Sequence, residues 1–133
     1  MEAADDMTDE HYEAMLVERE RGVEALLRAS NAAGAMGAAL SNPPFACKNP
    51  GIKERSAAVV SRALVALSAK DDVLNAYLQT LDADSCDHLM KYVVRLCSTA
   101  SAQSPLYLRI HGLILEKAGM GCLVRCIVDR RAA

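Results

Sequence analysis

The chain has 133 residues, 52% of them hydrophobic, and a formal net charge of -2. Binding to nucleic acid needs a basic face that neutralises phosphates, so this charge balance speaks against that class. A run of about 18 apolar residues, which a membrane-spanning helix requires, does not occur. A protein of this size leaves much of its surface exposed, so the composition predicts apolar patches that contact other proteins.

The sequence predicts an all-α fold, a compact bundle or superhelix of about seven short helices. Apolar residues recur at helical spacing, and capping residues, prolines and glycines separate the periodic segments. The pattern contains no strand-like alternation and no hairpin dipeptide. The expected helices run over about 9–29, 32–40, 50–69, 71–81, 84–97, 105–118 and from 120 toward the C-terminus.

The first expected helix begins after Thr8, which can cap it, and its acidic first turn favours the positive end of the helix dipole. The charged run 18–21 interrupts its apolar stripe. We therefore expect the front half to be solvated or bound to a partner, and the back half around Val23 to be core. Asn31 caps the second helix, which Gly34 and Gly37 weaken.

The loop after the second helix begins with Asn42-Pro43-Pro44, which cannot continue a helix. The Phe45 side chain is expected to pack into the core and so anchor this loop. Pro50 suits the first turn of the next helix. Further along, Asp71 or Asp72 is the expected cap of the fourth helix, and Asp84 that of the fifth.

The last two helices are the most apolar of the chain. The segment 105–118 is apolar almost all round, which indicates a central buried helix, and Gly119 fits its C-terminal cap. The final helix is expected to contribute core residues too. Its apolar residues are Met120, Leu123, Val124, Ile127 and Val128.

Five cysteines are present, and with no sign of a secretory leader they are expected to be reduced, buried thiols. The nearest approach to a metal site is Cys122 with Cys126, four residues apart, together with Cys86, His88 or His111. Zinc sites usually combine two close doublets, and a second doublet is missing. No phosphate-loop or nucleophile-elbow motif occurs either. The sequence therefore predicts no catalytic residues, no cofactor and no metal.

The chain opens with an acidic segment whose candidate partner-binding residues are Asp5, Asp6, Asp9 and Glu10. Such a segment is either a solvated tail or an arm that becomes ordered on a basic partner. We expect residues 1–21 to form an acidic arm or helix extension and 22–133 a single helical domain. Leaders begin with positive charge, so this acidic opening favours the cytoplasm.

Several stretches resemble the 16 kDa subunit (subunit 5) family of the actin-related protein 2/3 complex. The resemblance covers the chain from about Gly22 onward and is carried by Asn-Pro-Pro followed at the family's distance by Leu-Met-Lys-Tyr. The matching stretches are Ala38-Ala39-Leu40-Ser41-Asn42-Pro43-Pro44, Lys53-Glu54-Arg55, Val59-Val60, Leu81-Asp82, Asp87-His88-Leu89-Met90-Lys91-Tyr92-Val93, Glu116-Lys117-Ala118, Gly119-Met120-Gly121 and Val124-Arg125.

The resemblance implies a non-catalytic, all-helical subunit of the assembly that nucleates branched actin filaments. It further implies that the helical core docks on subunit 4 near subunit 1, and that an acidic N-terminal arm tethers the actin-related protein 2 subunit. The run before Gly22 is shorter than the family's arm and has a helical pattern. The alternative function is a free-standing helical adaptor that binds a peptide or helix in an apolar groove.

Overall fold

The structure is a computed structural model that describes residues 8–41, 43–98, 104–128 and 133. These residues form seven α-helices and no strand, so the predicted all-α class is confirmed. The chain divides into two compact units, which we describe separately. Unit 1 contains the residues up to Leu67 together with Ala133, and unit 2 spans Ser68–Ala132.

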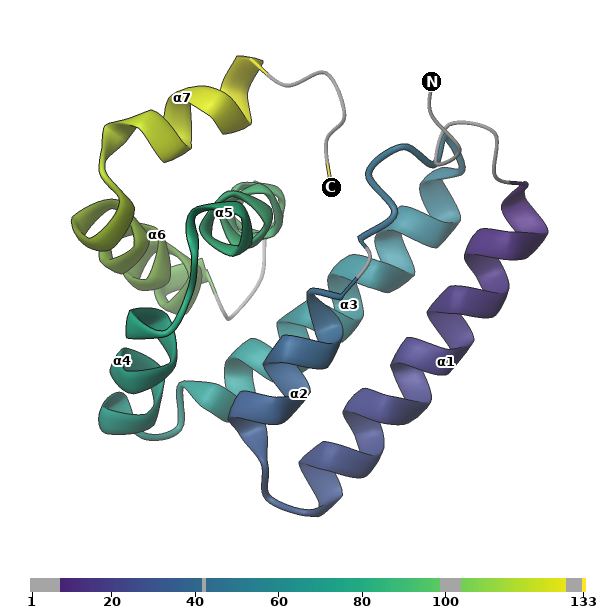
Figure 1. Cartoon of the computed structure of the whole chain (residues 1–133), viewed down its shortest axis with the longest axis horizontal. Coiled ribbons are helices and arrows are strands. Elements are labelled where there is room, and N and C mark those ends of the chain that lie inside the picture. The colour runs from purple at the N-terminus through teal and green to yellow at the C-terminus, as the bar shows by residue number, and fades with distance from the viewer. Residues whose placement is uncertain (1–7, 42, 99–103, 129–132) are drawn as a thin grey trace. The chain divides into compact units, whose positions relative to one another are not determined.

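Unit 1 consists of three helices that pack against one another: α1 (Asp9–Arg28), α2 (Ala32–Ala39) and α3 (Pro50–Leu67) (Figure 1). Two predicted caps are confirmed. The Thr8 hydroxyl accepts a hydrogen bond from the backbone N–H of His11, and the Asn31 side chain accepts one from Gly34. Each cap satisfies a backbone donor that the first helical turn leaves without a partner.

The front half of α1 is part of the core of unit 1, and the expectation that it is solvated was wrong. Tyr12, Leu16 and Arg19 are buried at spacings of four and three residues, and the same stripe continues to Val23. The charged run 18–21 does not mark an exposed face, because four consecutive residues of a helix point in different directions. Glu18 is exposed, whereas the guanidinium of Arg19 donates a hydrogen bond to the Ser41 carbonyl at 2.6 Å.

The segment that follows α2 reaches α3 by a loop in which Phe45 and Cys47 are buried, as predicted for Phe45. The buried face of α3 then packs into the core of unit 1. Its buried residues are Ile52, Ser56, Ala57, Val59, Val60, Ala63, Leu64 and Leu67.

Two glycines of α2 should respond in opposite ways to alanine. We expect Gly37→Ala to raise the free energy of unfolding by about 0.5–1 kcal/mol, because a Cβ there meets nothing within 4 Å and alanine favours helix. Gly34→Ala should lower it, because the added Cβ would lie 2.6 Å from Nδ2 of Asn31 and displace the cap. Urea denaturation followed by circular dichroism measures both; a gain for Gly34→Ala would contradict the cap geometry.

Unit 2 contains α4 (Asp71–Gln79), α5 (Ala83–Cys97), α6 (Ser104–Ala118) and α7 (Met120–Val128). The predicted caps of the first two were wrong. Lys70 occupies the N-cap position of α4 and makes no side-chain cap, and the cap of α5 is Asp82, whose carboxylate accepts a hydrogen bond from the Ser85 N–H at 2.7 Å. Gly119 caps α6 as predicted, with a φ of 83° that favours glycine.

The core of unit 2 lies mainly on α5, whose buried residues include Leu89, Met90, Tyr92 and Val93. The structure corrects the expected burial of the last two helices. α6 buries one side through Tyr107, Ile110 and Ile114, whereas Leu108 is 63% exposed. In α7 the buried residue is Cys122, and most of the large apolar side chains that we expected in the core lie outside.

Candidate interaction surfaces

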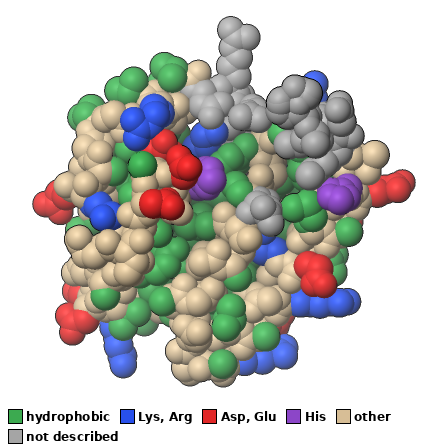
Figure 2. All heavy atoms as spheres, in the orientation of Figure 1, with side chains coloured by type: hydrophobic (Ala, Val, Ile, Leu, Met, Phe, Trp, Pro, Cys, Tyr) green, Lys and Arg blue, Asp and Glu red, His purple; other side chains and the backbone are tan. Residues whose placement is uncertain are grey.

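The largest group of exposed apolar side chains lies along one side of α7. We call this group the α7 stripe; it comprises Met120, Val124, Ile127 and Val128. Their exposed fractions are 63%, 51%, 70% and 70%. In Figure 2, hydrophobic side chains gather along the outer edge over α7. Apolar surface of this kind marks contact with another molecule more often than chemistry.

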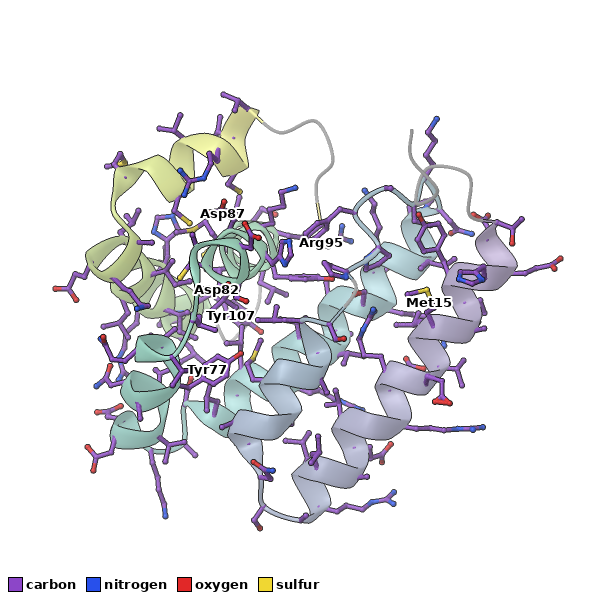
Figure 3. The ribbon with its side chains drawn as sticks, in the orientation of Figure 1. Met15, Tyr77, Asp82, Asp87, Arg95 and Tyr107 are labelled. Atoms are coloured by element: carbon purple, nitrogen blue, oxygen red, sulfur yellow. The ribbon has the colours of Figure 1, made fainter. Side chains whose placement is uncertain are left out.

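The opposite side of α7 is fixed to α5 by two contacts. Cys122 is fully buried, and its thiol donates a weak hydrogen bond to the Cys86 carbonyl at 3.5 Å. Arg125 donates two hydrogen bonds to the Asp87 carboxylate, at 2.8 and 3.0 Å, and Figure 3 shows Asp87 on the side of α5 toward α7. This pairing with Arg125 lowers the pKa of Asp87. The contacts fix which side of α7 faces outward.

Three thiols of unit 2, those of Cys86, Cys97 and Cys122, are in environments that suppress their reactivity. Burial raises the pKa of Cys122 to about 12, with the nearby Asp87 carboxylate acting in the same direction. Burial also raises the pKa values of Cys86 and Cys97. Because the thiolate is the nucleophile and the metal ligand, these side chains favour packing over catalysis.

In the part of the chain that the structure describes, the cysteine doublet considered from sequence does not gain a third ligand. Cys122 is buried and Cys126 is half-buried. Within residues 8–41, 43–98 and 104–128, no group of three or more His, Cys, Asp or Glu side chains is placed to hold a metal ion.

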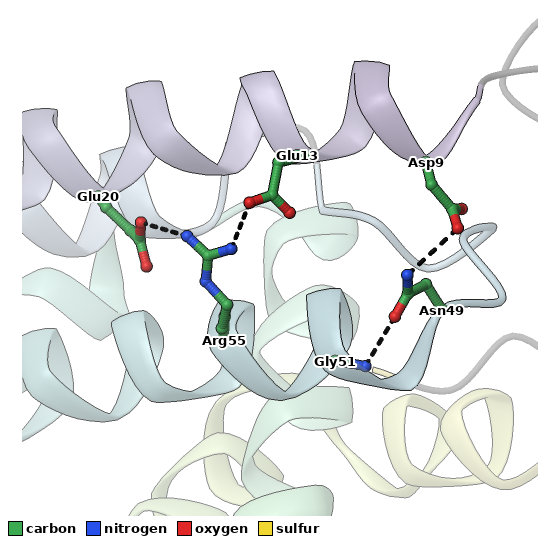
Figure 4. Close-up of polar contacts among 6 residues, drawn as sticks. All are labelled: Asp9, Glu13, Glu20, Asn49, Gly51 and Arg55. Atoms are coloured by element: carbon green, nitrogen blue, oxygen red, sulfur yellow. Dashed lines mark hydrogen bonds and ion pairs between the residues drawn. The ribbon is translucent and has the colours of Figure 1, made fainter.

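Two of the acidic partner-binding candidates lie in α1, and two lie outside the described residues. Asp5 and Asp6 belong to the second group. Asp9 and Glu10 are exposed in the first turn of α1. The Asp9 carboxylate accepts a hydrogen bond from the Asn49 side chain at 3.2 Å, and the Asn49 oxygen accepts one from the Gly51 N–H (Figure 4).

A second polar contact that the sequence analysis missed holds the front of α1 against α3. Arg55 donates hydrogen bonds to Glu13 at 2.6 Å and to Glu20 at 3.0 Å (Figure 4). The signal was the spacing of the two glutamates, since residues seven apart lie on one helix face. Both partners raise the pKa of Arg55 further, with the Glu13 bond contributing most. Together with the hydrogen bond between Asp9 and Asn49, this contact means that three acidic side chains of α1, Asp9, Glu13 and Glu20, make hydrogen bonds within unit 1.

An open cavity of about 320 Å³ lies between α1 and the end of α2. The space is open because several residues of its lining are small, and Glu18 and Arg19 are the charged residues of the lining. Its lining consists of Met15, Glu18, Arg19, Gly22, Ala38 and Ser41. This cavity is the feature of unit 1 that corresponds to the groove of the alternative function.

None of the helices in the described part of the chain has the length and apolar character needed to cross a membrane. Acidic and basic side chains are interspersed on the face drawn in Figure 2. Taken with the α7 stripe, the described residues define an all-α protein that carries apolar surface outside its core.

The comparisons with known proteins show which family within this class the chain belongs to. The model of the family "ARP2/3 complex 16 kDa subunit (p16-Arc)" matches residues 2–133. Actin-related protein 2/3 complex subunit 5 of Dictyostelium discoideum is 33% identical over 124 residues, which are 93% of this chain and 88% of that protein. The chain therefore belongs to the 16 kDa subunit family of the ARP2/3 complex.

Relatives in plants and animals are similar over most of their length. Subunit 5A of Arabidopsis thaliana is 35% identical over 117 residues, 87% of this chain and 86% of that protein. The human subunit 5-like protein is 32% identical over 129 residues, 92% of this chain and 83% of that protein.

Proposed function

We propose that this chain is a non-catalytic structural subunit of the actin-related protein 2/3 complex, and that it supports nucleation of branched actin filaments. Membership of the family supports the proposal. The structural observation that carries it is the apolar surface outside both units, where Val65, Val73 and Leu108 are exposed in addition to the α7 stripe. A subunit needs such surface, because burial of apolar area is the main favourable term in association.

The partners in this proposal are the other subunits of the complex. The helical core docks on subunit 4 near subunit 1, and the acidic opening with Asp5, Asp6, Asp9 and Glu10 tethers the actin-related protein 2 subunit. Actin filaments are contacted indirectly, and the protein acts in the cytoplasm on the actin cytoskeleton. We do not assign it a nucleic-acid partner or a membrane span.

The division at residues 21 and 22 remains part of this proposal, but it affects how the arm must be tested. α1 runs without a break from Asp9 to Arg28 and buries Tyr12 and Leu16. Deletion of residues 1–21 would therefore remove buried core residues as well as the acidic residues. Deletion of residues 2–7 keeps Thr8 and α1 intact and tests the acidic opening alone.

The deciding experiment is co-expression of this chain with the other subunits, followed by affinity capture and measurement of subunit stoichiometry. We expect one copy per complex and a complex that nucleates branches. Assembly of the remaining subunits without this chain would reject the proposal. Deletion of residues 2–7, or Asp5→Asn with Asp6→Asn, should leave stoichiometry unchanged but reduce branching several-fold; unchanged branching would reject tethering by this segment.

The cavity between α1 and α2 supports the second candidate, a free-standing adaptor. Its volume lies at the lower end of the range of ligand pockets, roughly 300–1,000 Å³. The distinguishing result is a stable monomer that binds amphipathic peptides and is not captured with the complex. Gly22→Leu places a side chain at the cavity wall, so it should abolish peptide binding if this function holds and leave capture intact if it does not.

A further inference from the structure

We propose that the α7 stripe is the apolar centre of a contact with a different protein, whose matching surface is apolar and carries little charge. This inference rests on the proposed function and deepens it, because it names the surface by which unit 2 joins the complex and the chemistry of the partner. Three observations lead to it: the arrangement of the stripe on α7, its charge and its area.

The stripe faces away from unit 2 as a single band. At about 100° per residue, Met120, Val124, Ile127 and Val128 fall within an arc of about 100°, and Cys122 lies on the opposite side. Cys122 is the buried residue of α7, so the helix has its packing side on α5 and a second apolar side outside.

The charge of α7 indicates what kind of surface can cover it. Between Met120 and Val128 the helix has one charged residue, Arg125, and both its hydrogen bonds in this contact go to Asp87. An acidic partner would therefore have to compete with Asp87. An apolar partner surface matches the stripe without that cost, because charges buried without a partner are strongly unfavourable.

The area of the stripe argues against a second copy of this chain as the occupant. At these exposures each of the four side chains offers roughly 100 Å² of apolar surface, about 400 Å² in all. Two stripes face to face would bury about 800 Å², less than the roughly 1,200 Å² at the lower end of stable interfaces. A stable contact therefore needs further surface around the stripe, which a second stripe alone does not supply.

A membrane surface is also a poor match. Helices that lie in the membrane interface keep a polar face rich in Lys and Arg toward water. The side of α7 opposite the stripe packs against unit 2 instead, and its one arginine is paired. The geometry therefore favours a protein partner.

The test introduces a carboxylate into the stripe and measures incorporation into the complex in competition with the wild-type chain. We expect Val124→Asp and Ile127→Asp each to reduce incorporation at least about tenfold, because the new charge would be buried without a partner. Ala76→Asp is the matched control: Ala76 is an exposed apolar residue on α4 of the same unit, and its substitution should change nothing. Thermal unfolding should be alike for all three variants.

The outcomes separate this inference from the proposed function. If the wild-type chain is not incorporated, the proposed function fails. If the wild-type chain and both stripe variants are incorporated equally, the proposed function stands and the stripe inference alone is overturned. A wild-type dimer that Ile127→Asp dissociates, or binding to phosphatidylserine-containing vesicles that this variant loses, would also overturn it.

A second measurement uses only the wild-type protein and so does not depend on the folding of a variant. Met120 is 63% exposed, and its oxidation by hydrogen peroxide can be followed by mass spectrometry. We expect oxidation of Met120 to be at least about tenfold slower in the assembled complex than in the isolated chain. Equal rates in the two states would overturn the inference.

Discussion

Replacement of Leu16 by Ala is expected to lower the free energy of unfolding by about 3 kcal/mol. Leu16 lies in the front half of α1 and is 1% exposed, so the substitution removes buried methyl groups and leaves a cavity among side chains that relax only in part. The loss should appear as a lower urea midpoint in the helical circular dichroism signal, with little change in slope.

Leu26→Ala is the matched control for this prediction, because it is the same substitution ten residues further along α1. Leu26 is half-buried, so its cost should be about 1 kcal/mol. Glu18→Ala, on the exposed side near Leu16, should change stability by no more than about 0.5 kcal/mol. A greater loss for Leu26→Ala than for Leu16→Ala would mean that the front of α1 is not core.

The first two helices of this protein could be predicted closely, including their capping residues. Thr8 and Asn31 stand directly before periodic segments, and both cap them. Before α4 and α5, aspartates at 71, 72, 82 and 84 compete, and their side-chain chemistry is the same. The choice among them depends on where the chain enters the helix, which tertiary packing decides.

Burial was harder to predict, because an apolar pattern identifies a face of a helix but not what covers it. α7 is apolar on two sides, and the sequence cannot distinguish the side that meets α5 from the side that meets solvent. Arg19 shows the converse. A charged side chain is usually assigned to the surface, but Arg19 is buried, and its guanidinium donates a hydrogen bond to the Ser41 carbonyl.

The polar contacts of α1 depend on residues far apart in the sequence. Asp9 meets Asn49, and Glu13 with Glu20 meets Arg55, so the partners lie 35 to 42 positions away. An acidic helix start predicts only a favourable dipole interaction. That these acids also join α1 to the start of α3 follows from the packing of two helices, which a single sequence does not fix.

A rise in pH from 9 toward 12 is expected to destabilise unit 2 by on the order of 2–4 kcal/mol. The pKa of Cys122 is raised to about 12 by burial, whereas an unfolded cysteine ionises near 9. The unfolded chain therefore loses this proton first. The stabilisation is fully present below pH 9 and is lost as the pH rises through the interval, at about 1.4 kcal/mol per pKa unit.

Tyr77 contributes in a narrower interval, because burial raises its pKa from 10.0 to about 12. The cysteines can thus be separated from Tyr77 between pH 9 and 10, where Cys122 acts together with the other buried thiols, Cys86 and Cys97. Urea denaturation at half-unit steps from pH 8 to 11 should show a decline that begins near pH 9 in both proteins and is steeper in the wild type than in Cys122→Ala. Identical profiles for the two proteins would show that Cys122 is not the group responsible.

The same titration should affect assembly, because Cys122 is the residue that α7 buries on the side opposite the stripe. Ionisation of its thiol would place a charge beside the Asp87 carboxylate and weaken the attachment of α7 to α5. A stripe on a loosened helix must be ordered again when a partner binds, which lowers affinity. Incorporation of the wild-type chain should therefore fall as the pH rises from 9 toward 12, and Cys122→Ala should show a smaller fall.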